Sequence, residues 1–149
     1  MIPPPTDEDG KDVKDRYSDI RQGRSKGLGG NKYYGYEDNL YEIVQSNLQE
    51  FGIDQVQKNV SLIKGLVQDT MKVDQPIALA HIDVDWYDPV KTCIERIVPY
   101  LVVGGILILD DYSTWSGCRK ATDEYFRGIA EQFQMDDSAG SMKIVRLAG

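Results

Sequence analysis

HIDVDWYD (residues 81–88), read together with LILDDY (residues 107–112), decides the fold. Each stretch continues an apolar run of the kind that is buried in a sheet, and each run ends in acidic residues. In an open α/β sheet, ligands bind beyond the carboxyl ends of the strands, so acids placed there face a site instead of bulk water. The acids are Asp83 and Asp85 in the first stretch and Asp110 and Asp111 in the second.

The two acidic strand ends are expected to lie close together. Consecutive strands joined by a helical crossover are neighbours about two-thirds of the time, and neighbouring strands are ~4.8 Å apart. Carboxylates at that separation repel one another, and a hard cation with oxygen ligands, Mg²⁺ or Ca²⁺, relieves the repulsion. The alternative is purely structural: Asp88 caps the next helix, and Asp110 with Asp111 only closes a strand.

Composition limits the classes of function. A chain of 149 residues fits one domain, and its formal charge of −7 argues against binding nucleic acid or an anionic membrane surface. No apolar run approaches the ~20 residues of a membrane span, and Met1 does not open a signal peptide. Cys93 and Cys118 are predicted to be free thiols in a reducing compartment, which indicates a cytoplasmic protein.

The first 36 residues are predicted to form a polar loop or lid. They contain three consecutive prolines and several glycines but few large apolar residues. The run KGLGGN (residues 26–31) could suggest a phosphate-binding loop. It is better explained as a flexible loop, because no strand precedes it and no Lys-Ser or Lys-Thr pair follows it.

Residues 37–149 are predicted to alternate between helices and strands. The apolar spacing predicts a helix over residues 37–51, and strands are expected at residues 60–63, 77–84, 106–109 and, at an edge, 142–147. The near-continuous apolar run of residues 77–84 is typical of a parallel strand covered on both faces. Helices are expected from Asp88 to about Leu101 and from Cys118 to Phe133. This order predicts a single α/β domain with a mainly parallel sheet and flanking helices.

The single histidine, His81, is expected on the same face as Asp83, because it lies two residues before it. A hydrogen-bonded role in the core or behind a ligand is favoured over a catalytic role.

The stretch from His81 to Phe126 resembles the macrocin O-methyltransferase family. The shared pattern is Asp-x-Asp followed by an aromatic residue, a helix, a Gly-Gly turn, a strand ending in Asp-Asp-Tyr, and a helix that starts Gly-Cys-Arg-x-Ala. IPPPTDEDG (residues 2–10) and SLIKGLVQDTM (residues 61–71) are similar to further segments of that family. The resemblance implies a Rossmann-like class I methyltransferase fold. It also implies an S-adenosylmethionine-dependent enzyme that methylates a hydroxyl, of the kind found on the sugars of secondary metabolites.

The resemblance also implies roles for single residues. Asp83, Asp110 and Asp111 would hold Mg²⁺, and Asp85 would be the general base. Such an ion lowers the pKa of an acceptor hydroxyl and positions it, while a nearby carboxylate takes the proton. Near the adenine of the cofactor the resemblance places Gly65, Gln68 and Asp69.

The chain departs from the family pattern at its amino end. The first strand, the glycine-rich loop and the second strand of a class I methyltransferase are not recognisable, so the fold is expected to be partial, corresponding to the carboxyl-terminal part of a longer protein. The expected partner is a small-molecule hydroxyl acceptor, and a sheet edge left uncovered by the missing strands would allow self-association. The alternative function is a non-catalytic methyltransferase-like module that binds a metal or a partner chain.

Overall fold

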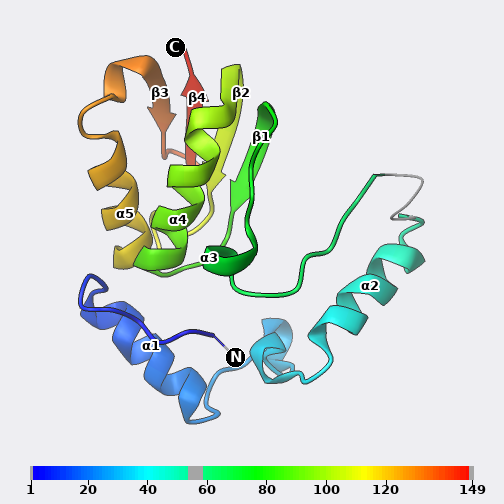
Figure 1. Ribbon diagram of the computed structural model, residues 1–149. Helices are drawn as coiled ribbons and strands as arrows, with labels where there is room; N and C mark the ends of the chain where they lie inside the picture. Colours follow the sequence, from blue (N-terminus) through cyan, green and yellow to red (C-terminus); the bar gives the residue numbers. More distant parts are fainter. Residues whose placement is uncertain (1, 54–58, 148–149) are drawn as a thin grey trace.

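The computed structural model describes residues 2–53 and 59–147. Its centre is a four-stranded sheet with the order β1-β2-β4-β3 (Figure 1). The strands are β1 (Ile77–Ile82), β2 (Leu101–Leu109), β3 (Phe133–Asp136) and β4 (Met142–Arg146). β1 and β2 are parallel, whereas β4 is antiparallel to both β2 and β3. The α/β class is confirmed, but in the described part of the chain only one of the pairings is parallel.

The carboxyl-terminal strands differ from the prediction in one respect. Residues 142–147 were expected to form an edge strand, but β4 lies inside the sheet and β3 forms the edge. The predicted helix over residues 118–133 is shorter, because α5 (Ser116–Phe126) ends before Gly128. Phe133 then begins β3, which turns back through Gly140 (φ +94°) into β4. This hairpin gives β4 its second neighbour.

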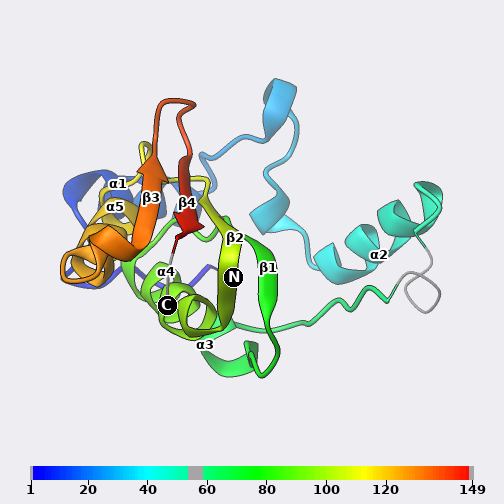
Figure 2. The same cartoon turned by 90° about the horizontal axis from the view of Figure 1, so that it is seen from above.

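The core lies between the sheet and two helices, α4 (Tyr87–Ile97) and α5, which cover the same face of the sheet (Figures 1 and 2). Side chains alternate across a strand, so every second residue of β2 and β4 points at these helices. The fully buried members of this core are Val90, Ile94, Leu107, Leu109 and Ile144.

Within the part of the chain that the structure describes, the opposite face of the sheet is largely uncovered. Leu79 of β1 is 63% exposed, whereas Leu107 of β2, on the helix-covered face, is 0% exposed. The expectation that residues 77–84 form a strand covered on both faces is therefore wrong. The strand is apolar on both sides, but among the described residues the helices pack against one side only.

The predicted strand over residues 60–63 is absent. The backbone there has no regular secondary structure and pairs with no strand of the described chain, and Ile63 is 69% exposed. β-rich sequence alone does not make a strand when no neighbouring strand in the described chain can supply the ladder of hydrogen bonds. The segment leads into the short helix α3 (Val67–Thr70), which contacts α4. The guanidinium of Arg96 in α4 donates to the carbonyls of Val67, Gln68 and Met71 at 3.1, 2.8 and 2.7 Å.

The first 36 residues are not a loop throughout, which corrects that prediction. Helix α1 (Lys11–Arg21) buries Val13 and Ile20, which pack with Tyr33 and Trp86. Val13, Tyr17 and Ile20 recur at helical spacing, but the charged residues between them obscure this short stripe in the sequence. Single 3-10 turns follow at Leu28–Gly30 and Tyr34–Tyr36.

Helix α2 (Leu40–Glu50) confirms the helix predicted over residues 37–51. It buries none of its residues and projects away from the sheet in both views (Figures 1 and 2). No helix within residues 2–53 and 59–147 has the length and apolar character needed to cross a membrane.

Candidate functional site

The site is built where β1 and β2 end. The two strands run in parallel with Ile82 opposite Leu109, and the backbone N–H of Asp110 donates to the carbonyl of Ile82 at 3.0 Å. Asp83 directly follows β1 and Asp111 follows β2 by two residues. The pairing therefore carries both acids to the same edge of the sheet.

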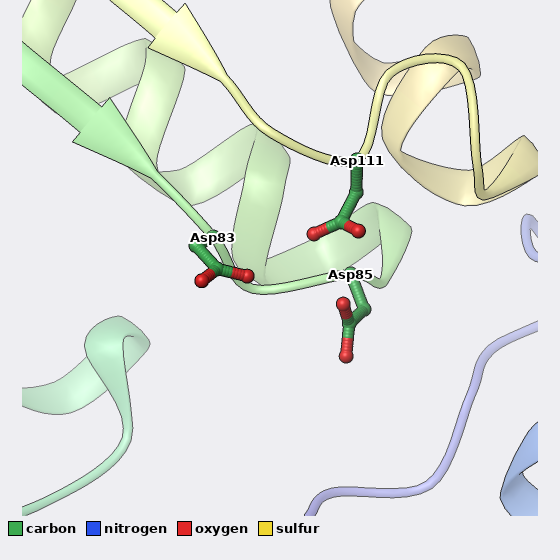
Figure 3. A group of neighbouring side chains, drawn as sticks. All are labelled: Asp83, Asp85 and Asp111. Carbon is green, nitrogen blue, oxygen red and sulfur yellow. The ribbon is translucent and has the colours of Figure 1, made fainter. Parts of the chain in front are cut away.

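Three of the four predicted acids form a compact group. Asp83, Asp85 and Asp111 each offer a carboxylate oxygen, and these oxygens all lie within 4.8 Å of one another. Figure 3 shows Asp83 and Asp111 at the two strand ends, with Asp85 beside them on the loop that leads to α4. In the described part of the chain, none of the three carboxylates forms an ion pair with Lys or Arg.

The backbone at Asp85 is unusual. Its φ is +59°, a left-handed conformation that non-glycine residues seldom adopt. The backbone N–H of Trp86 donates to the carbonyl of Val84 at 2.6 Å, which closes a tight turn around Asp85. A residue held in such a conformation costs on the order of 1–3 kcal/mol and persists only when its surroundings fix it. This turn brings Asp85 beside Asp111.

The crowded carboxylates change their proton affinity. Burial, a hydrogen bond with Asp85 and the charges of Asp85, Asp83 and Asp110 raise the pKa of Asp111 to about 8. Burial also raises the pKa of Asp85, although the hydrogen bond with Asp111 and the charge of Arg16 oppose that change. Asp111 Oδ2 is buried and has no hydrogen-bond partner in the part of the chain that the structure describes.

These features fit a divalent cation. Three carboxylates within reach of one ion are the oxygen ligands that Mg²⁺ and Ca²⁺ prefer. An ion between them would replace the proton that the group otherwise retains, and it would give the buried Asp111 Oδ2 a partner.

Asp110 is not part of the compact group. Ser141 Oγ donates to Asp110 Oδ1 at 3.1 Å, and His81 Nε2 lies 3.5 Å from the same oxygen. The physical reason is the two-residue period of extended chain: Asp110 shares a sheet face with Ile108, which pairs with His81, while Asp111 points to the other side. His81 is not a core residue, because its side chain is 54% exposed.

The residues predicted near the cofactor do not belong to the group of three acids. Gln68 and Asp69 belong to α3, and the carbonyl of Gln68 accepts from Arg96. Gly65 has φ +146°, and a Cβ at this position would overlap Thr70 Cγ2. Gly65 also lines a cavity of about 600 Å³ between α2, residues 34–38 and residues 62–66.

Sequence reasoning missed two residues of the amino-terminal segment. The guanidinium of Arg16 stacks over the ring of Tyr33 at 5.2 Å, donates to Ser25 Oγ at 3.0 Å, and acts electrostatically on Asp85. Burial, Tyr33 and the charges of Asp85 and Asp83 raise the pKa of Tyr34, so this phenol also lies within range of the acids. The aromatic cluster YYGY (residues 33–36) could have indicated a packed segment near the site, but it lies in a segment that was predicted to be a loop.

Comparisons with known proteins agree with this architecture. A family model described as Macrocin-O-methyltransferase (TylF) matches residues 36–142. A curated relative from Streptomyces olivaceus, the 8-demethyl-8-(2,3-dimethoxy-alpha-L-rhamnosyl)-tetracenomycin-C 4'-O-methyltransferase, is 28% identical over 66% of this chain and 38% of its own length. The demethyldecarbamoylnovobiocin O-methyltransferase of Streptomyces niveus is 29% identical over 56% of this chain and 32% of its own length.

A solved structure shows that the fold is shared. The O-methyltransferase NovP superposes with a TM-score of 0.71 at 19% identity, and the match covers 99% of this chain and 56% of NovP. The chain thus spans little more than half of that protein and less than two-fifths of the two curated relatives. Because the family model spans well over half of the chain, the protein belongs to the macrocin O-methyltransferase family.

Proposed function

We propose that this chain carries the metal-binding and proton-accepting part of an O-methyltransferase. This enzyme would use S-adenosylmethionine and Mg²⁺ to methylate a sugar hydroxyl on a secondary metabolite. The observation that carries the proposal is the convergence of Asp83, Asp85 and Asp111 within 4.8 Å at the ends of adjoining strands. Family membership supplies the reaction class, and the rhamnosyl substrate of the Streptomyces olivaceus relative supports a rhamnosyl-type acceptor.

Asp83 and Asp111 are the ligands that the geometry supports best. They come from neighbouring strand ends, and Asp111 carries the buried oxygen without a partner among the described residues. The third ligand is Asp110 if its carboxylate turns away from Ser141, and Asp85 if it does not. Bound Mg²⁺ would lower the pKa of the acceptor hydroxyl and position it.

Asp85 is proposed as the general base. Its carboxylate lies beside the metal ligands, and its raised pKa makes it a better proton acceptor than an ordinary aspartate. The acceptor oxygen forms a bond to the methyl carbon as the bond from that carbon to sulfur breaks. The hydroxyl proton passes to Asp85, and S-adenosylhomocysteine leaves. Gly65, Gln68 and Asp69 are proposed to lie near the adenine of the cofactor, with the cavity beside Gly65 as the space for it.

Methyl transfer tests the proposal directly. Incubation with S-adenosylmethionine and L-rhamnosyl acceptors, followed by mass spectrometry, should show a gain of one methyl group that requires Mg²⁺ and is abolished by EDTA. Asp85→Asn should reduce turnover and retain Mg²⁺ binding if Asp110 is the third ligand. If Asp85 is itself a ligand, Asp85→Asn should weaken Mg²⁺ binding and Asp110→Asn should not. Mg²⁺ binding without methyl transfer by this chain would instead favour a binding module.

A further inference from the structure

The two residues that follow Asp85 are both held by the first nine residues of the chain. The indole N–H of Trp86 donates to the carbonyl of Pro3 at 3.1 Å, and the backbone N–H of Tyr87 donates to Asp9 Oδ1 at 2.9 Å. Trp86 is 1% exposed and packs edge to face on Trp115, with ring centroids 5.9 Å apart. The turn that contains Asp85 is therefore fixed immediately on its carboxyl-terminal side.

Asp9 is a buried charged residue outside the acid group. It is 2% exposed, and its second oxygen, Oδ2, accepts from the backbone N–H of Thr6 at 2.8 Å. Tyr87 begins α4, so the Asp9 carboxylate takes the place of an N-cap side chain for that helix. Trp86, at the N-cap position, makes no such bond itself, and Asp88, predicted as the cap, lies inside the first turn.

Gly117 makes room for this carboxylate. A Cβ at Gly117 would overlap Asp9 Oδ1 and would lie 2.8 Å from the backbone N of Tyr87. Asp9 thus lies between the amino-terminal ends of α4 and α5, where the partial positive charges of the two helices favour an anion. This explains how a carboxylate can be buried there.

We propose that Asp9 is a positioning residue for Asp85. By holding Tyr87, and with Pro3 holding Trp86, it maintains the left-handed backbone of Asp85 and so keeps that carboxylate beside Asp83 and Asp111. Without this hold, Asp85 relaxes to the negative φ that L-residues prefer, and its side chain leaves the group. The inference rests on the proposed function, because it assigns Asp9 to the same metal-binding site.

A merely structural role for Asp9 makes a different prediction. If Asp9 only caps α4, its removal lowers the melting temperature but leaves both the Mg²⁺ affinity and the methyl transfer of the folded protein unchanged. Asp12 is the matched control, because it caps α5 by accepting from the backbone N–H of Ser116 at 2.8 Å and makes no bond to Tyr87.

The test is isothermal titration of the full chain with MgCl₂, together with the melting temperature of each variant. Asp9→Ala should reproduce the effect of Asp85→Asn. If Asp85 is the third ligand, Mg²⁺ binding should weaken about 10-fold or more, the loss typical of residues that orient a metal ligand. If Asp85 acts only as the base, Mg²⁺ binding should remain and methyl transfer should fall. Asp9→Asn, which retains an acceptor oxygen for Tyr87, should stay near wild type. Asp12→Ala should lower the melting temperature and leave the affinity unchanged.

A second variant keeps the test decisive if Asp9→Ala does not fold. Gly117→Ala leaves the Asp9 charge in place but displaces its carboxylate from Tyr87, and it should have the same effect as Asp9→Ala. Wild-type Mg²⁺ affinity together with wild-type methyl transfer in folded Asp9→Ala or Gly117→Ala would overturn the positioning role while the proposed function stands. Failure of the wild-type chain to bind Mg²⁺ would overturn both.

Discussion

Asp85 and Asp111 bring carboxylate oxygens within 4.8 Å of each other, although one precedes α4 and the other follows β2. Carboxylates this close repel each other when both are charged, and this crowding together with burial raises the pKa of Asp111 to about 8. The arrangement therefore stores a proton at neutral pH at the place where we propose that a metal ion binds.

The raised pKa of Asp111 predicts how stability depends on pH. Between the ordinary value of 3.8 and about 8, the folded protein holds a proton at Asp111 that the unfolded chain has released. This group therefore makes the free energy of unfolding fall as pH rises through that window. Urea unfolding of the metal-free protein at several pH values should show a smaller fall for Asp111→Asn than for wild type. Identical pH slopes would contradict the raised pKa.

The one-sided burial of the sheet predicts unequal costs for two leucines. Leu107→Ala removes a fully buried side chain beneath α4 and α5 and should lower the free energy of unfolding by about 2–5 kcal/mol. Leu79→Ala removes a side chain that is 63% exposed and should change it by less than about 0.5 kcal/mol. Denaturant unfolding checks both values. A cost for Leu79→Ala as large as that for Leu107→Ala would mean that the second face is covered in solution.

Arg96 is predicted to hold α3 in place. Its guanidinium reaches three carbonyls of α3 and the residue after it, and an ammonium group cannot span them in the same way. Arg96→Lys should therefore cost about 1–3 kcal/mol of stability and speed amide exchange in residues 67–71. Arg127→Lys, at an exposed position after α5, is the control and should change neither. Unaltered exchange in Arg96→Lys would remove this role.

The two cysteines are predicted to be unreactive in the folded protein. Cys93 and Cys118 are free and are 2% and 1% exposed. Burial is the main cause that raises the pKa of Cys93 to about 11 and that of Cys118 to about 12. Because the thiolate is the reactive form, Ellman's reagent at pH 8 should label neither thiol until the chain is unfolded. Rapid labelling of the native protein would show that the core between α4 and α5 opens.

The sequence was most informative where local pattern and burial agree. Two apolar runs, which end at Asp83 and Asp110, predicted β1 and β2. The apolar stripe of α4 predicted the helix between them. The same reasoning failed where tertiary contacts decide. Residues 60–63 have the composition of a strand but no neighbouring strand in the described chain. β3 is too short to give a recognisable pattern in the sequence.

The sequence predicted the acidic residues of the site but not the residues that hold them in position. Acids at strand ends can be recognised from the sequence, yet adjacent acids point to opposite sides of an extended chain, which separates Asp110 from Asp111. The role proposed for Asp9 could not be predicted from the sequence, because its partner Tyr87 lies far along the chain. The sequence also does not distinguish a buried aspartate from an exposed one.

Mg²⁺ binding by the wild-type chain and by single-site variants tests the central claim most directly. Isothermal titration should show one Mg²⁺ site in wild type, loss of that site in Asp83→Asn and in Asp111→Asn, and retention in Asp88→Asn, an exposed acid of the same stretch outside the group. The affinity of wild type should rise with pH towards about 8, because the ion displaces the proton held by Asp111. The account would be contradicted if wild type did not bind Mg²⁺, or if Asp83→Asn and Asp111→Asn bound it with the affinity of wild type.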